Sequence, residues 1–313
     1  GERRARTAGA SLIGQPGPVA VLETIEGKKI DLAELYGKKP VYLKFWATWC
    51  VPCRQQMPGF EQLQQTMGDR VQVIAVNTGF SDDIESIRAY RKEHQLTMPI
   101  MIDDGSLAAD LNLRVTPQHV VIGRDGRISH IGHLDDQALH AALERAVSEQ
   151  TAPASRSETS TAPETPQFAV GDTVTDLSIE TLDGRQVQLG KGDKPRALVF
   201  FAPWCESYLE ESRPETSQAC LRVRKDVDNL MGQSDMEWLG VSSGLWVSAS
   251  DLQDYKNTTP TALPLVLDEQ DELFRAFAIR DIPTVVLLDA QGRVANILKP
   301  QDSNLVAAVK ALR

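Results

Sequence analysis

The stretch FWATWCVPCRQQMP, residues 45–58, holds two cysteines, Cys50 and Cys53, with Pro52 between them. It continues an apolar run typical of a buried strand, VYLKFWA, and leads into a helical pattern, CRQQMPGFEQLQQTM. Cys50 is therefore expected where a helix begins, and the free N–H groups and dipole of a helix N-terminus favour thiolate over thiol. We predict a lowered pKa for an exposed Cys50, with Cys53 shielded one turn later and able to attack a mixed disulfide on Cys50.

The second half of the chain repeats this pattern with one cysteine missing. FFAPWCESYLEESRP, residues 200–214, has Cys205 after an apolar run but Tyr208 where a second cysteine would stand. Between the halves, residues 148–168 are rich in Ser, Thr, Ala, Pro and Glu, a composition typical of a flexible linker. We predict two domains, 11–148 and 168–313, joined by a linker over 149–167.

Both halves alternate short apolar runs with helical patterns in the same order. Runs such as VQVIAV and TVVLLD are continuous, which favours strands buried on both faces of a sheet. Alternation of such strands with helices indicates βαβ units, hence an α/β fold. A repeat of this length indicates a duplicated domain, because solenoid repeats are about 20–50 residues long.

Charge and composition exclude several classes of function. The chain has 313 residues and a formal net charge of -10, which argues against non-specific nucleic-acid binding. It holds no run of about 18 apolar residues, so no membrane span is expected, and its first residues, GERRARTAGA, lack the apolar core of a secretory signal. Four cysteines are too few for a disulfide scaffold in a chain of this length.

Two other uses of Cys50 and Cys53 are less favoured. A zinc site would need a second pair of ligands, and His130 and His133 would point to opposite faces of a strand, so no metal site is expected. A purely structural disulfide across so short a loop at a helix start would be strained and would stabilise the fold poorly. Thiol-disulfide exchange fits the spacing best.

FWATWCVPCRQQMP resembles the active-site segment of thioredoxin-like proteins. GKKIDLAELYGKKPVYLKFWATWC and LRVTPQHVVIGRDGRI are similar to segments of extracytoplasmic thiol-disulfide oxidoreductases of the TlpA/ResA/CcmG type. The resemblance implies two tandem thioredoxin-like folds, each a central mixed β-sheet flanked by helices. It also implies catalysis by Cys50 and Cys53, a cis peptide bond before Pro117, and a substrate strand held by Thr116 and Pro117. Trp49 is expected to supply contact area to the substrate.

The same resemblance implies the partners and the location. The partners would be proteins with disulfide bonds and an upstream thiol donor, with no cofactor, in the periplasm or another extracytoplasmic space. We predict a disulfide oxidoreductase that acts as a reductant. The alternatives are an isomerase or oxidant of folding proteins, and a metallochaperone that holds Cu(I) between Cys50 and Cys53.

Two positions depart from the family pattern. Lys44 stands where thioredoxins keep a buried acid, and Gln56 stands where ResA-like proteins often have a glutamate. Neither position therefore offers a carboxylate as proton acceptor for Cys53. Lys44 either lies near the sulfurs and favours thiolate by its charge, or extends to the surface.

The second half offers a possible second site at Cys205 and Pro283, because Ile282-Pro283-Thr284 repeats the proline motif. Cys220 follows Cys205 by fifteen residues, which in one straight helix is a rise of about 22 Å. We therefore expect Cys220 to be buried and inert, and the second half to be a binding or docking domain. A Cys205–Cys220 disulfide remains the alternative, and it requires the helix to break near Pro214.

Overall fold

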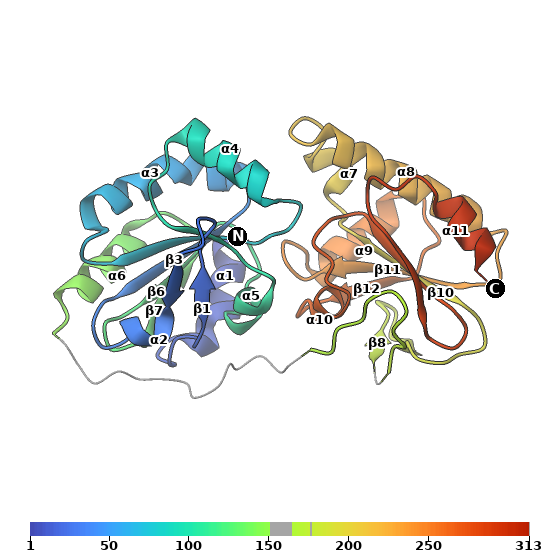
Figure 1. Cartoon of the computed structure of the whole chain (residues 1–313), viewed down its shortest axis with the longest axis horizontal. Helices are drawn as coiled ribbons and strands as arrows, with labels where there is room; N and C mark the ends of the chain where they lie inside the picture. Colours follow the sequence, from blue (N-terminus) through green and yellow to red (C-terminus); the bar gives the residue numbers. More distant parts are fainter. Residues whose placement is uncertain (151–164, 176, 313) are drawn as a thin grey trace. The chain divides into compact units, whose positions relative to one another are not determined.

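The computed structural model describes residues 1–150, 165–175 and 177–312. These residues form two compact units, Gly1–Glu164 and Thr165–Arg313, each with its own five-stranded sheet (Figure 1). Most of the expected linker, residues 151–164, lies outside the described residues. Within the described ranges, no helix combines the length and the apolar character that crossing a membrane requires.

Strands and helices alternate through the first unit. Its elements are α1 (Glu2–Gly9), η1 (Ala10–Leu12), β1 (Val21–Glu23), β2 (Lys29–Asp31), α2 (Leu32–Leu35), β3 (Val41–Trp46), α3 (Val51–Met67), β4 (Gln72–Asn77), α4 (Ile84–His94), β5 (Ile100–Ile102), α5 (Ser106–Asp110), β6 (Gln118–Ile122), β7 (Ile128–Gly132) and α6 (Gln137–Ser148). The main sheet has the order β5-β4-β3-β6-β7, in which β3, β4 and β5 are parallel and β6 and β7 are antiparallel additions. Strands β1 and β2 form a separate antiparallel pair.

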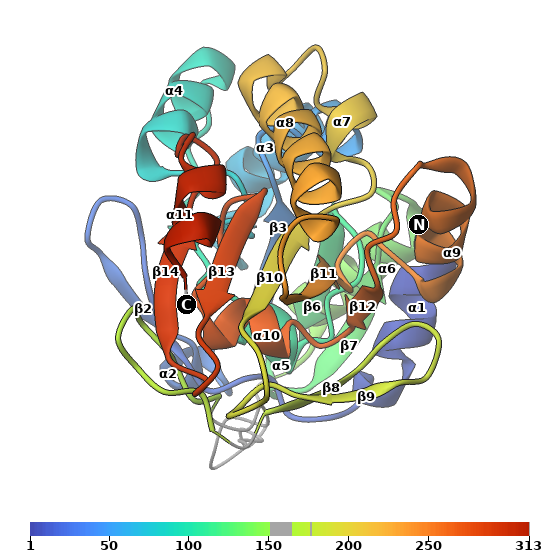
Figure 2. The same cartoon turned by 90° about the vertical axis from the view of Figure 1, so that its right-hand side faces the viewer.

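The second unit repeats this order of elements. Its elements are β8 (Ser178–Glu180), β9 (Gln186–Gln188), β10 (Arg196–Phe201), α7 (Cys205–Tyr208), α8 (Pro214–Met231), β11 (Glu237–Ser243), α9 (Ala249–Thr258), β12 (Leu265–Asp268), α10 (Glu272–Ala276), β13 (Thr284–Leu288), β14 (Val294–Leu298) and α11 (Leu305–Ala311). Its sheet order, β12-β11-β10-β13-β14, matches that of the first unit strand for strand and can be followed in Figure 2. The prediction of two thioredoxin-like α/β folds is confirmed.

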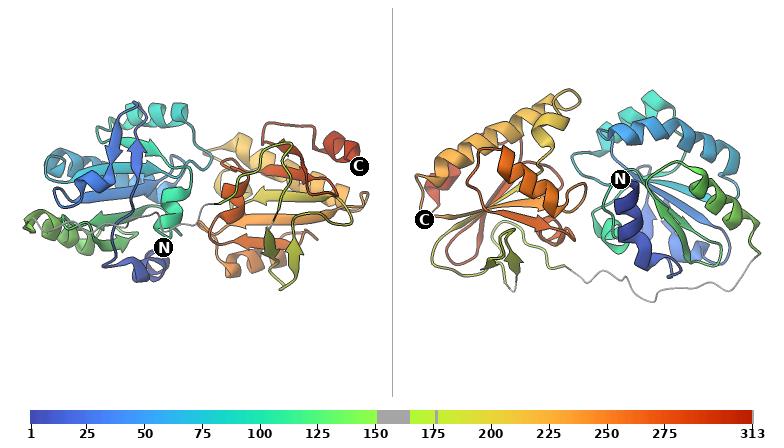
Figure 3. Two further views of the ribbon diagram at one scale, coloured as in Figure 1. Left: turned by 60° about the horizontal axis from the view of Figure 1, so that its bottom comes forward. Right: turned by 180° about the vertical axis from the view of Figure 1, so that it is seen from behind.

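The central strand β3 is buried along its whole length, as its apolar sequence predicts. Alternate side chains of a strand point to opposite faces, so Tyr42 and Trp46 share one face of the sheet. Tyr42 packs edge-on against Phe60 of α3, and Trp46 packs against Tyr90 of α4. Helices α3 and α4 therefore cover the same face, as Figure 3 also shows.

The corresponding face of the second unit is covered in the same way. One apolar cluster joins alternate residues of β10 (Ala197, Val199 and Phe201) to side chains of α8, α9 and α11. Each unit thus has a hydrophobic core against its own sheet, and β3 and β10 are the corresponding central strands.

Helix α1 precedes the start of the expected first domain and packs against the first unit. The backbone N–H groups of His133 and Leu134 donate to the carboxylate of Glu2, at 2.6 and 2.8 Å. A Cβ atom at Gly9 would lie only 2.7 Å from Cγ2 of Ile131, so this glycine permits the close approach of α1 to β7.

Candidate active site

The two cysteines of the first unit lie at the start of α3, directly after β3. Cys50 is the N-cap residue, Pro52 lies in the first turn, and Cys53 is bonded to Cys50 in a disulfide with the Cα atoms 5.2 Å apart. The backbone N–H of Cys53 donates to Sγ of Cys50 at 3.3 Å. The predicted placement of this pair at a helix N-terminus is therefore confirmed.

The surroundings of the disulfide are more enclosed than the sequence predicts. Cys53 is fully buried, as expected, but Cys50 is only 3 % exposed. One cause is Thr116, whose hydroxyl group lies 3.3 Å from Sγ of Cys50. Cys50 still has the larger exposed fraction of the two.

The segment of Thr116 and Pro117 reaches the disulfide because β6 is antiparallel to β3. Gln118 is paired with Phe45, so Pro117 lies where β3 leads toward Cys50. The Thr116-Pro117 peptide bond is cis, as the resemblance implies. Sequence-distant residues thus meet at one sulfur atom.

The loop after β4 supports the residues that precede Cys50. The indole N–H of Trp49 donates to the carbonyl of Phe80 at 2.8 Å, and the backbone N–H of Thr48 donates to the carboxylate of Asp82 at 2.8 Å. Trp49, expected to face the substrate, is 4 % exposed. In this structure Trp49 anchors the loop and offers little surface for contact.

Lys44 lies on the same face of the sheet as Tyr42 and is fully buried, so the alternative of a surface lysine is wrong. Among the described residues its ammonium group has no hydrogen-bond partner, and it lies 4.9 Å from the centre of the Phe60 ring. Burial lowers the pKa of Lys44 to about 7, against a smaller opposite effect of Asp135.

A chain of hydrogen bonds links Tyr42 of β3 to Pro117, the residue that follows Thr116. Gln56 donates its amide N–H to the carbonyl of His133 at 3.1 Å, so its oxygen accepts from Nε2 of His119 at 2.9 Å. Nδ1 of His119 then accepts from the Tyr42 hydroxyl at 2.7 Å, and Nδ1 of His133 donates to the Pro117 carbonyl at 2.7 Å. These partners hold His119 as a neutral imidazole.

The pKa of His119 agrees with a neutral ring. Burial, followed by the positive charge of Lys44, lowers the pKa of His119 well below its ordinary value. Lys44 of β3 and His119 of β6 are opposite each other in the register of the two antiparallel strands. The site therefore contains two buried basic groups whose charged forms are disfavoured.

Sequence reasoning missed this chain of hydrogen bonds, although one feature of the sequence pointed to it. Lys44 in VYLKFW and His119 in PQHVVI are polar residues inside apolar strand runs, and polar residues buried in a core need partners. The sequence alone shows Gln56 only as a missing carboxylate. Within the described ranges, no three His, Cys, Asp or Glu side chains gather as metal ligands would.

In the second unit Cys220 is buried, as expected, but it is not an unpaired, inert thiol. Cys205 and Cys220 form a disulfide, with the Cα atoms 6.4 Å apart. The reason is that α7 ends at Tyr208 and α8 begins only at Pro214, so the two cysteines do not share one straight helix. The Ile282-Pro283 peptide bond is cis, like its counterpart in the first unit.

Comparisons with known proteins agree with the geometry of the first unit. The AhpC/TSA family matches residues 13–131. The thioredoxin-like protein YneN of Bacillus subtilis is 38% identical over 134 residues, which are 42% of this chain and 78% of YneN. The thiol-disulfide oxidoreductase ResA of Bacillus cereus is 32% identical over 138 residues, with the same shares of the two chains.

Among solved structures, StoA of Bacillus subtilis is 26% identical, with a TM-score of 0.36, over 42% of this chain and 97% of StoA. The sequence relatives share more than three quarters of their own length with this chain. With a Cys50–Cys53 disulfide at the start of α3 and a cis-proline beside it, the chain belongs to the thioredoxin-like thiol-disulfide oxidoreductases that include ResA and YneN.

Proposed function

We propose that the first unit reduces disulfide bonds in partner proteins, with Cys50 as the attacking and Cys53 as the resolving residue. The observation that carries this proposal is the arrangement of donors at one sulfur: the N–H of Cys53 and the hydroxyl of Thr116 both lie 3.3 Å from Sγ of Cys50. In the oxidised state this Sγ is a disulfide sulfur. After reduction the same donors and the N-terminus of α3 stabilise a thiolate there.

The reaction proceeds by two exchange steps. The Cys50 thiolate attacks one sulfur of the substrate disulfide, forms a mixed disulfide and releases the other substrate sulfur as a thiolate, which takes up a proton. The Cys53 thiol releases its proton to solvent and attacks Sγ of Cys50, which breaks the mixed disulfide and releases the second substrate thiolate. Two electrons have then passed to the substrate. An upstream thiol donor reduces the Cys50–Cys53 disulfide and so regenerates the dithiol.

The segment of Thr116 and Pro117 is the proposed docking edge for the substrate chain. A proline lacks an N–H group, and an extended substrate can pair with the backbone that precedes it, as in strand addition. The carbonyl of Pro117 accepts from His133 at 2.7 Å, which fixes this segment beside Cys50. Binding there would place a substrate sulfur in line with Sγ of Cys50.

A reducing role and an extracytoplasmic location are both part of this proposal. A strong oxidant has a reduced form that is unusually stabilised. In this chain two hydrogen-bond donors and the N-terminus of α3 stabilise the Cys50 thiolate, but burial keeps His119 neutral, so no charged imidazole adds to that stabilisation. A reductant of protein disulfides meets its substrates where disulfides persist, in oxidising compartments outside the cytoplasm.

The attacking and resolving roles are tested with serine variants of the full chain. Cys53→Ser is expected to lose insulin reduction by about 100-fold or more and to accumulate a mixed disulfide on Cys50, because nothing resolves it. Cys50→Ser is the matched control, expected to be inactive without trapping substrate. If Cys53→Ser reduces insulin as fast as the unmodified chain, the dithiol mechanism is wrong.

The direction of electron flow is tested by equilibrium with redox buffers. For a reductant, the Cys50–Cys53 disulfide should resist glutathione and open only in buffers of dithiothreitol, measured by alkylation and mass spectrometry of the peptide that contains both residues. Opening at ordinary ratios of reduced to oxidised glutathione would instead indicate the isomerase or oxidant function.

A further inference from the structure

The second unit has a disulfide where a ResA-like site would have a CxxC pair. Cys205 opens α7 directly after β10, as Cys50 lies directly after β3. Its partner comes from the second turn of α8, because the chain turns between Leu209 and Arg213 and brings Cys220 back to α7. The disulfide therefore lies at the same end of the central strand as the first site.

The cis-proline of the second unit has the same register as that of the first. Thr284 is paired with Phe200, which precedes Cys205 by five residues. In the first unit Gln118 is paired with Phe45, which precedes Cys50 by the same number. Pro283 therefore has the same position in the strand register relative to Cys205 as Pro117 has relative to Cys50.

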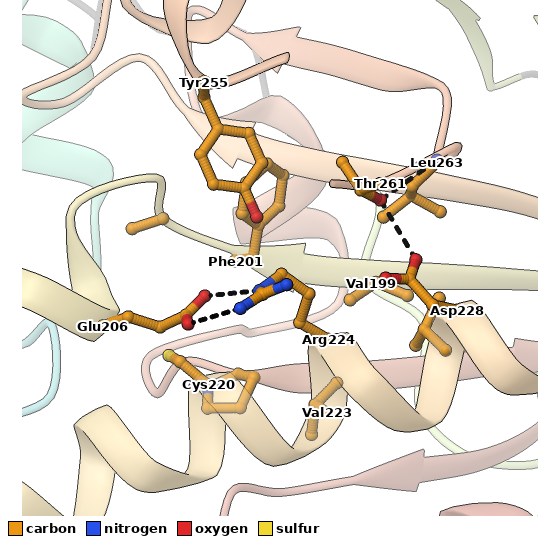
Figure 4. Close-up of a pocket in the computed structure, with 13 residues that line it drawn as sticks. Val199, Phe201, Glu206, Cys220, Val223, Arg224, Asp228, Tyr255, Thr261 and Leu263 are labelled. Carbon is orange, nitrogen blue, oxygen red and sulfur yellow. Dashed lines mark hydrogen bonds and ion pairs between the residues drawn. The ribbon is translucent and has the colours of Figure 1, made fainter. Parts of the chain in front are cut away.

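The two cysteines of this disulfide differ in exposure. Cys205 is fully buried, whereas Cys220 is 8 % exposed and lines a pocket (Figure 4). Pro283 lines the same pocket. Cys205 is not among the residues that line this pocket. An incoming thiolate can therefore approach Cys220 from the pocket, and we assign Cys220 as the attacked residue.

Contacts other than the disulfide also hold α7 against α8. Glu206, next to Cys205, forms a two-pronged ion pair with Arg224 of α8, at 2.8 and 3.0 Å (Figure 4). The hydroxyl of Ser217 donates to the carbonyl of Glu206 at 2.6 Å. When the disulfide opens, these contacts keep the two thiols within reach of each other, as a reversible redox pair requires.

We propose that Cys205–Cys220 is a second thiol-disulfide exchange centre, which accepts two electrons from a protein dithiol at Cys220. A donor thiolate attacks Sγ of Cys220, forms a mixed disulfide, and breaks the bond to Cys205, which leaves as a thiolate and takes up a proton. The second donor thiolate then attacks the donor sulfur of the mixed disulfide. This step closes the donor disulfide and releases the Cys220 thiolate.

The test uses the full chain with Cys50→Ser and Cys53→Ser, so that its result does not depend on the function proposed for the first unit. This variant is equilibrated with increasing ratios of reduced to oxidised glutathione, then alkylated and analysed by mass spectrometry, with near-UV circular dichroism as a measure of folding. We expect Cys205 and Cys220 to become alkylated together while the fold is kept. A disulfide that stays closed until urea unfolds the unit, or whose opening unfolds it, would overturn the proposal.

The attacked sulfur is identified by removing one cysteine at a time on the same background. With Cys205→Ser, we expect Cys220 to form a mixed disulfide with glutathione in the folded protein. With Cys220→Ser, the buried Cys205 should react at least about tenfold more slowly. Equal rates, or faster reaction of Cys205, would overturn the assignment of Cys220.

The contribution of the ion pair is tested with Glu206→Gln. Loss of the pair frees α8 from α7 only in the reduced form, so the glutathione ratio needed to open half of the disulfide should fall about fivefold. Asp235→Asn is the matched control, because it removes the carboxylate of an exposed ion pair with Lys194 in the same unit. Equal ratios in the two variants would contradict a role for Glu206 in holding the thiols together.

Discussion

Lys44 is the residue whose placement departs furthest from what its chemistry favours. Its ammonium group is buried over the Phe60 ring, and a contact of this kind offsets only part of the cost of removing a charge from water. The result is a pKa of about 7 in the folded chain, against 10.5 for the free side chain. Protonation of Lys44 therefore favours the unfolded chain and lowers the free energy of unfolding near neutral pH.

The sign of the pH effect follows from that difference. Between pH 7 and about 10 the unfolded chain binds more protons at Lys44 than the folded chain, so the contribution of Lys44 to the free energy of unfolding rises with pH. Lys44→Met should stabilise the first unit by roughly 1–4 kcal/mol at pH 7 and remove this rise. The measurement is urea unfolding followed by hydrogen exchange of β3 amides, with the exposed Lys28→Met as the control. A variant less stable than the unmodified chain throughout this range would contradict the argument.

At the scale of elements, Gln56 joins three parts of the first unit. It lies on α3 and contacts His119 of β6 and the carbonyl of His133, which follows β7. His133 in turn donates to the carbonyl of Pro117. The helix that carries the cysteines and the strand that carries the cis-proline are thereby tied by side chains as well as by packing.

Gln56→Glu tests this tie through the titration of His119. The new carboxylate would lie about where the amide oxygen accepts from Nε2 of His119, and an opposite charge at that distance favours the protonated imidazole. The pKa of His119 should rise by about 1 unit or more, measured from its ring resonances in NMR spectra. Gln62→Glu, at an exposed position of the same helix, should leave His119 unchanged. An unchanged His119 in Gln56→Glu would show that the contact is absent in solution.

The sequence predicted the elements better than the contacts between them. Apolar runs and turn residues located the central strands, and the motif around Cys50 placed the disulfide at a helix start. The Cys205–Cys220 bond was not favoured because a helical pattern spans both cysteines and does not show that the chain turns between Tyr208 and Pro214. Side-chain partners such as those of Gln56 depend on strand register, which no local pattern specifies.

For the whole molecule, the two units share the same strand order, and single residues of their central strands occupy corresponding positions. Leu43 is fully buried in β3 opposite Val120, and Leu198 is fully buried in β10 opposite Val286. Each leucine lies in the central strand of its own sheet, and each sheet is complete within its unit. We therefore propose that the units unfold as separate domains.

Leu43→Ala and Leu198→Ala form a matched pair for this proposal. Each removes the same buried side chain from the same position of a central strand, which should lower the free energy of unfolding of its own unit by about 2–5 kcal/mol. Hydrogen exchange of β3 and β10 amides, followed in one sample of the full chain, reports both units at once. Leu43→Ala should speed exchange in β3 and leave β10 as it was, with the reverse for Leu198→Ala, because each leucine packs in a sheet that is complete within its own unit. If either substitution speeds exchange equally in both strands, the two sheets unfold together and the chain is one cooperative body.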